Sequence, residues 1–180
     1  MQILPNTLLT PMAAPYTQEH VDQLYGLIGK AVWHLQHLEN IVASFTAFKI
    51  LQAKREKGQK LKQADAARVI ERQKGQTLGP LIGTAKAHKT IPAALAKRFD
   101  ALLAERNWLI HHCVTDEYLS LRNESERERL FFRIGSFAEE AIALQNSIHG
   151  MFENWFTELG YDLSGAYAVA DEQLKKAERS

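Results

Sequence analysis

The sequence predicts an all-α protein, an antiparallel bundle of about four to five helices. Apolar residues recur at spacings of three and four along most of the chain, which is the period of an amphipathic helix. Only five prolines occur, and three of them stand within the first fifteen residues. No stretch with a period of two is long enough to predict a strand. At 180 residues, 46% hydrophobic and 24% charged, the chain has the length and composition of one globular domain.

The chain divides into an N-terminal arm (residues 1–16), a helical bundle (17–160) and a C-terminal tail (161–180) that can form one more helix. Thr17 can cap the first helix, because its hydroxyl can accept a hydrogen bond from a free N–H of the first turn. This helix should end near Gly58. Its apolar stripe, which predicts one face packed on a partner helix, consists of Ile28, Ala31, Leu35, Leu38, Val42 and Phe45.

Two shorter elements precede the central helix. Residues 61–74 read as a short helix that Gly75 ends. The following segment, "TLGPLIGTAKAH", contains two glycines and a proline, so it predicts a short, imperfect helix or a turn. Thr90 then caps a central helix over residues 91–113.

The last long helix begins at Asn123, where Glu126 is spaced for a capping box, and Gly160 ends it. Its apolar positions again alternate between steps of four and three, so this helix also has one buried face. They are Leu130, Ile134, Phe137, Ala141, Leu144, Ile148, Met151 and Trp155.

The charge of the chain is unevenly distributed. Residues 49–98 hold thirteen Lys or Arg against three Asp or Glu, although the whole chain has a net charge of only +1. Two interpretations remain open: a solvated helical hairpin with long basic side chains, or a binding surface for a polyanion such as RNA. Candidate nucleic-acid-binding residues within this segment are Lys60, Lys62, Lys86 and Lys89.

The central helix carries a cation in its apolar stripe. On a helical wheel, Arg106 lies at the centre of the face that Leu102 and Leu109 define. A charge in such a place is nearly always paired. The opposite face holds Ala104, a small residue, and Trp108, which needs a cover if it is not to be exposed. We therefore expect both faces to be packed, one of them against a second subunit.

The residues after Arg106 carry chemistry. Asn107 and His111 are four apart and share one side of the helix, so the amide can orient the imidazole. The guanidinium of Arg106 is a planar fork suited to a phosphate, and an imidazole exchanges protons near neutral pH. Metal-independent RNA cleavage needs a base, a cation and an acid. His112, or the His111 of a second subunit, could supply the second proton-transfer group.

The stretch "RNWLIH", Arg106 to His111, resembles the R-x(4-6)-H signature of HEPN domains, in which a polar residue, often Asn, follows the arginine. His112 also satisfies the looser spacing. Many HEPN proteins are ribonucleases that act as toxins, in abortive infection or within CRISPR systems, and they usually dimerise to form a composite site. The resemblance covers residues 17–160. The resemblance implies a homodimeric, metal-independent endoribonuclease whose catalytic residues are Arg106, Asn107 and His111. RNA would be its substrate, and an antitoxin or a defence protein would be its partner.

Other interpretations of the same residues remain open. Arg106 can pair with a core acid such as Glu39, while His111 and His112 stabilise the end of their helix. The chain would then be a catalytically inactive HEPN-like module that dimerises and binds a nucleotide, RNA or a protein, or a plain helical interaction domain.

Other residues of the sequence give weaker signals. His34 and His37 are three apart, but no third ligand is spaced near them, so we expect no metal site and no cofactor. Cys113, the single cysteine, falls on the core face and should be structural. No basic secretory leader and no apolar run of membrane-spanning length is found. Together with the lone cysteine, this predicts a cytoplasmic protein.

Overall fold

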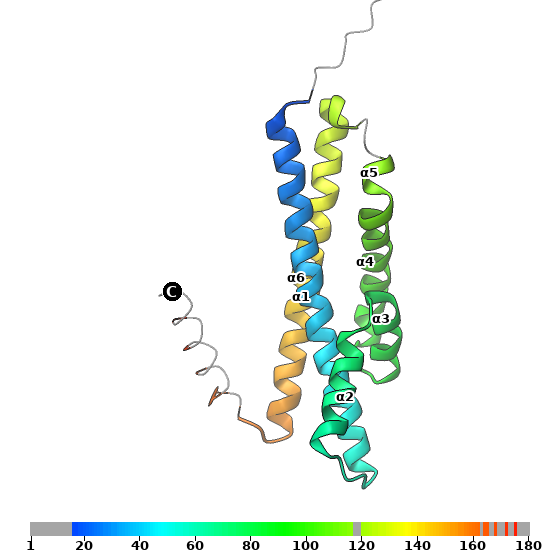
Figure 1. Ribbon diagram of the computed structural model, residues 1–180, viewed down its shortest axis with the longest axis vertical. Coiled ribbons are helices and arrows are strands. Elements are labelled where there is room, and N and C mark those ends of the chain that lie inside the picture. The colour runs from blue at the N-terminus through cyan, green and yellow to red at the C-terminus, as the bar shows by residue number, and fades with distance from the viewer. Residues whose placement is uncertain are drawn as a thin grey trace, which may run out of the picture.

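The computed structural model describes residues 16–116, 120–162 and five positions of the tail (164, 165, 168, 172 and 175). Within the part described, every regular element is helical, so the predicted all-α bundle is confirmed (Figure 1). Tyr16 apart, the predicted arm lies outside the described residues, as does most of the tail. The elements are α1 (Gln18–Glu56), α2 (Gln63–Lys74), α3 (Leu78–Ala87), α4 (Ala93–His111), α5 (Cys113–Asp116), a 3₁₀ turn (Ser120–Arg122) and α6 (Glu124–Glu158).

The two long helices, α1 and α6, lie side by side and run in the same direction (Figure 1). Lys30 pairs with Glu139 at 2.7 Å, and further along both helices Phe45 packs on Trp155 with ring centroids 5.6 Å apart. Two neighbouring parallel helices need a connection that runs back along the bundle. α4 provides it, because it lies between α1 and α6 in the sequence and runs antiparallel to α6. α2 and α3 pack against the second half of α1.

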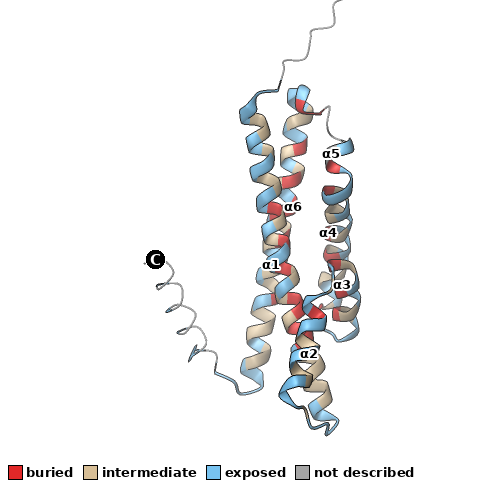
Figure 2. Cartoon of the chain, in the orientation of Figure 1, coloured by how far each residue is buried: buried red, intermediate tan, exposed pale blue. Residues whose placement is uncertain are grey.

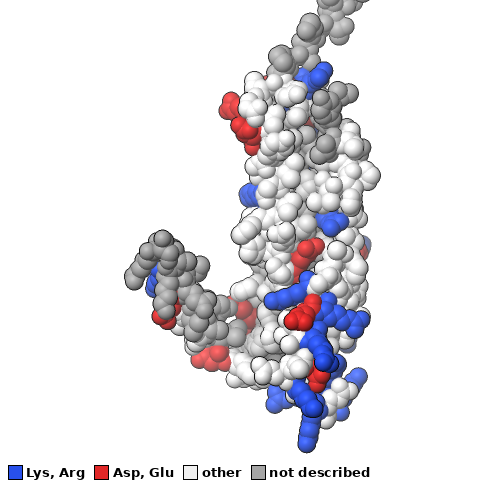
Figure 3. Space-filling view, in the orientation of Figure 1, with Lys and Arg blue, Asp and Glu red and all other residues white. Residues whose placement is uncertain are grey.

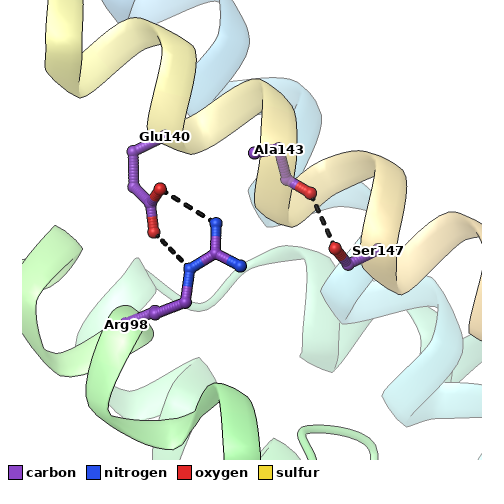
Figure 4. Close-up of polar contacts among 4 residues, drawn as sticks. All are labelled: Arg98, Glu140, Ala143 and Ser147. Atoms are coloured by element: carbon purple, nitrogen blue, oxygen red, sulfur yellow. Dashed lines mark hydrogen bonds and ion pairs between the residues drawn. The ribbon is translucent and has the colours of Figure 1, made fainter.

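α4 is tied to α6 by an ion pair with two hydrogen bonds. Nε and Nη2 of Arg98 donate to the two carboxylate oxygens of Glu140, at 2.7 and 2.9 Å (Figure 4). One turn further along α6, Ser147 donates to the carbonyl of Ala143, which is a bond within the helix. The Arg98–Glu140 pair therefore sets how α4 lies along α6.

The hydrophobic core runs along the axis of the bundle, where α1, α3, α4 and α6 face one another (Figure 2). The apolar stripes predicted for the first and last helices are its main components. Fully buried members include Leu38, Val42, Leu78, Leu81, Phe99, Leu102, Ile134, Leu144 and Ile148.

Most predicted helix ends are observed. The side chain of Thr17 accepts the N–H of His20, and Asn123 accepts the N–H of Glu126. Gly58 and Gly160 follow α1 and α6 with φ of 74° and 80°, a left-handed conformation that glycine adopts without a steric penalty. The capping role predicted for Thr90 is wrong, because Pro92 occupies the N-cap position of α4.

α3 is more regular than the sequence indicated. Despite two glycines and a proline, it is a continuous ten-residue helix. It buries Leu78, Leu81, Ile82 and Ala85 against the bundle. Burial of this face outweighs the low helix propensity of the segment. None of the helices in the described part of the chain has the length and apolar character needed to span a membrane.

Candidate functional site

Arg106 lies on the inner side of α4, half-buried between the buried residues Leu102 and Leu109. Its Nη1 donates to Oδ1 of Asn107 at 3.2 Å. Its Nε is buried and has no hydrogen-bond partner among the described residues. A buried guanidinium N–H without an acceptor carries a desolvation cost, which an acceptor brought to Nε would offset.

Glu39 on α1 is an acid whose charge interacts with the charge of Arg106. Burial raises the pKa of Glu39, while the positive charge of Arg106 and the N–H of Leu78, which donates to the carboxylate, act in the opposite direction. Leu78 is the first residue of α3, whose N-cap residue Thr77 makes no side-chain cap. The carboxylate of Glu39 thus acts on the N-terminus of α3 from a neighbouring helix. The predicted attraction between Glu39 and Arg106 is present, but as a through-space interaction.

The two histidines lie at the end of α4. His111 is its last residue and His112 its C-cap, and both are exposed. Their ring centroids are 6.5 Å apart and the rings are nearly perpendicular. His111 shares its side of the helix with exposed Asn107, whereas Arg106 is about 140° away around the axis. One subunit therefore does not bring the guanidinium of Arg106 and the imidazole of His111 together.

Trp108 is covered within the same chain. Arg133 of α6 places its guanidinium 3.5 Å from the centroid of the indole ring. The same guanidinium donates to both oxygens of Glu105, at 2.8 and 3.1 Å. The expectation that Trp108 needs a second subunit as its cover is wrong, because α6 supplies a cation that stacks on the ring.

An open groove runs between α4 and α6 beside this cluster. It encloses about 510 Å³ and is predominantly apolar, with Ala101 on one side and Phe132 on the other. Phe132 is the most exposed large apolar residue described, at 77%. The Arg98–Glu140 and Glu105–Arg133 pairs also line the groove.

The four candidate nucleic-acid-binding lysines do not form one cluster. Lys86 is neutralised by Asp100, with 2.7 Å between Nζ and the carboxylate. Lys62 is the N-cap residue of α2, and Lys89 lies in the turn before α4 with a left-handed φ of 56°. Lys60 lines a hollow between α1 and α2. Basic side chains nevertheless gather at one end of the molecule, over α2 and the adjoining part of α1 (Figure 3).

Apart from Lys60, the cations that line hollows at this end were not among the candidates predicted from the sequence. Lys54 of α1, Arg72 of α2 and His88 after α3 all line one cavity of about 430 Å³. Arg68 and Arg72 are four apart and therefore share a face of α2, a spacing visible in the sequence. Their meeting with Lys54 depends on how α2 packs on α1, which the sequence alone does not give.

Cys113 is buried and forms no disulfide, and the prediction that it falls on the core face is confirmed. His37 packs on Trp33, with ring centroids 4.8 Å apart. Over the described residues, no three metal-ligating side chains come together as a metal site would require.

Comparisons of the chain with models of protein families, with curated proteins and with solved structures found no match.

Proposed function

We propose that the chain is a metal-independent endoribonuclease of HEPN type, toxin-like or defence-related, which cleaves RNA at a site shared by two subunits. The observation that carries the proposal is the guanidinium of Arg106, half-buried, hydrogen-bonded to Asn107 and with an unpartnered Nε. Two exposed imidazoles follow it within six residues. A preformed cation with a free donor is what a phosphate that gains charge in the transition state requires.

In the proposed reaction an imidazole of His111 or His112 removes the proton of a ribose 2′-hydroxyl. The 2′-oxygen attacks the adjacent phosphorus, and the bond from phosphorus to the 5′-oxygen breaks. A second imidazole, in its protonated form, donates a proton to that leaving oxygen. The products are a 2′,3′-cyclic phosphate and a 5′-hydroxyl. Arg106 stabilises the charge on the phosphorane, and Asn107 holds the guanidinium through its Oδ1.

The divergence of Arg106 and His111 around α4 supports a shared site, since a second copy can present its histidine to the arginine of the first. The groove between α4 and α6, which is lined by none of Arg106, Asn107, His111 and His112, supports a dimer contact. Its protruding residue, Phe132, and its open side at Ala101 belong to one face of one chain. A two-fold contact needs such a self-complementary face, on which each Phe132 enters the groove of the other copy. The proposed partner is therefore a second copy of this chain.

Cleavage of a fluorescent RNA in the presence of EDTA tests the proposal. The wild type should cleave, and His111→Ala should lose at least a hundredfold in rate. His149→Ala is the matched control, because His149 is an exposed histidine of α6 that pairs with Glu153 in its own helix. Equal rates for the two variants would contradict the proposal. Toxicity on expression, wild type against His111→Ala, tests the toxin-like role and the need for a neutralising partner.

A catalytically inactive HEPN-like module, which dimerises and binds a nucleotide, RNA or a protein, is the alternative. One observation favours it: none of Arg106, Asn107, His111 and His112 lines any of four cavities of about 280 to 510 Å³ over the described residues. Binding of RNA without cleavage by a sedimenting dimer would support this alternative.

A further inference from the structure

Three hollows lie in series at the end of the bundle where α2 packs on α1. The cavity of about 430 Å³ between α1, α2 and α3 adjoins a second of about 320 Å³, because both are lined by Lys54, Val69 and Arg72. The second adjoins a third of about 280 Å³, between α1 and α6, through Leu61. We call this series the basal groove. It is longer than a single small anion requires.

The cations of the basal groove have few acidic partners. Lys54, Lys60, Arg72 and His88 form no ion pair with an acid among the described residues, whereas Arg68 lies 3.7 Å from Asp65. Figure 3 shows basic side chains over this end of the molecule. Cations that line a concave surface with few counter-charges attract a polyanion that can follow the groove.

Neutral polar groups line the first hollow beside these cations. The hydroxyl of Thr84 has two acceptors for its one proton, the carbonyl of Pro80 at 3.1 Å and Oε1 of Gln76 at 3.3 Å, and Nε2 of Gln76 donates to Gln73 at 2.7 Å. Gln73 is only 4% exposed, so this chain of hydrogen bonds is anchored in the protein interior. It holds an amide and a hydroxyl at the wall of the cavity, where they can hydrogen-bond to a base or a ribose.

The third hollow is aromatic. Phe48, Trp155, Phe156 and Tyr161 line it together with Arg55, whose Nη1 lies 3.5 Å from the hydroxyl of Tyr161. Phe48 and Tyr161 keep more than a third of their surface exposed. Exposed rings beside a basic groove are the arrangement by which proteins hold single-stranded nucleic acid, with phosphates on cations and bases stacked on aromatic faces.

We propose that the basal groove binds single-stranded RNA, with phosphates along Lys54, Lys60 and Arg72 and a base stacked in the aromatic hollow. The ligand class rests on the proposed function, but binding in the groove does not require cleavage. The groove is remote from the motif, since Lys54 stands fifteen residues beyond Glu39 on α1, or roughly 22 Å along the helix. It thus acts as an anchoring site that holds one part of the strand while another part reaches Arg106.

The test measures binding of a short fluorescein-labelled oligouridine by anisotropy, between 50 and 200 mM salt, in the full chain carrying His111→Ala. This background separates loss of binding from loss of cleavage. Lys54→Gln with Arg72→Gln should weaken binding about tenfold and reduce the slope of log K against log salt by about 1.4, since each phosphate contact contributes about 0.7. The matched control is Lys30→Gln with Arg129→Gln, which removes the same charge from two paired cations. It should leave the slope unchanged.

Tyr161→Ala tests the aromatic hollow, and an exposed tyrosine of α1, Tyr25, gives the control Tyr25→Ala. Binding should weaken at least fivefold in the first variant and not in the second. Circular dichroism confirms folding, and Arg72→Gln alone, at an exposed position, serves if the double variant does not fold.

Three outcomes would overturn the proposal. The wild type could fail to bind the oligonucleotide, or the groove and control variants could lose affinity equally, which is the behaviour of bulk charge. The same groove variants could instead lose binding to phosphatidylcholine vesicles that contain phosphatidylserine while RNA is ignored, which would make the surface a membrane contact. Binding that persists in His111→Ala without cleavage in the wild type would sustain the groove and refute the nuclease.

Discussion

The seam between α4 and α6 and the basal groove differ in whether their cations are paired with acids. Along the seam between α4 and α6, Arg98 and Arg133 each donate two hydrogen bonds to a carboxylate. In the basal groove, Lys54 and Arg72 line a cavity without an acid in ion-pair contact among the described residues. The first pair fixes the position of two helices. The second pair is proposed to bind a ligand.

Arg106 lies between these two cases. Glu39 attracts Arg106 electrostatically, as the acids of the seam attract their cations. The Nε of Arg106, however, has no acceptor among the described residues. The difference between the regions gives a criterion: a cation whose removal costs stability is structural, and one whose removal costs ligand binding is functional. The following predictions place individual residues by this criterion.

The largest effect is expected at Arg106. Arg106→Lys keeps the charge but loses the planar fork, so cleavage should fall by a factor of roughly 100 while the protein remains folded. Arg98→Lys makes the same exchange at a seam cation and should leave cleavage within about twofold of the wild type. Initial rates on a fluorescent RNA and thermal unfolding by circular dichroism measure both. A folded Arg106→Lys protein with full activity would remove Arg106 from phosphate binding.

The next effect is on stability at the seam. Arg133→Ala removes a doubly hydrogen-bonded ion pair and the cover of Trp108, so the free energy of unfolding should fall by about 1–2 kcal/mol. Lys54→Ala in the basal groove should change it by less than about 0.5 kcal/mol. Urea denaturation followed by circular dichroism gives both values. If Lys54→Ala proves as costly as Arg133→Ala, the groove cations belong with the structural ones and the comparison fails.

The seam also separates protein contact from RNA contact. Phe132→Glu places a charge where the proposed second copy packs, so the dimer should dissociate at least tenfold more readily. Sedimentation at micromolar concentration measures this, with Tyr25→Glu as the control at another exposed aromatic residue. RNA binding in the basal groove should survive in the monomer. A wild type that sediments as a monomer would rule out the shared site.

The sequence predicted the helices well because their signals are local. A threonine before the first apolar stripe and glycines after the long helices mark ends that the structure reproduces at Thr17, Gly58 and Gly160. The regularity of α3 was underestimated. Its glycines and proline are local signals for an imperfect helix or a turn, and burial overrides them. Periodicity also put Arg106 on the inner face of its helix.

The sequence could not predict which side chains of different helices come into contact in the folded protein. Trp108 and its cover Arg133 are on different helices, and nothing in the pattern of either helix announces the pairing. In the same way, Lys54 and Arg72 share a cavity only because α2 folds back on α1. Charge along the chain therefore indicated the basic region, but not which of its cations remain unpaired.

The smallest effect is expected at Glu39, and it decides how Arg106 should be classed. Burial raises the pKa of Glu39, so its favourable contribution to stability is complete in acid and is lost as pH rises through that pKa. Glutamine does not ionise. Relative to the wild type, Glu39→Gln should therefore gain stability as pH rises from 4 to 7. The gain should be less than about 1 kcal/mol, because solvent screens this half-buried group.

Glu139→Gln is the control of opposite sign. The hydrogen bond and charge of Lys30 lower the pKa of Glu139, so its contribution is present at neutral pH and is lost in acid. Relative to the wild type, Glu139→Gln should lose stability as pH rises over the same range. Urea denaturation at several pH values measures the sign of each difference. If Glu39→Gln behaved like Glu139→Gln, the attraction of Arg106 would outweigh the burial of Glu39. Arg106 would then be the counter-ion of Glu39, as Lys30 is of Glu139, and its guanidinium would not be available to a phosphate.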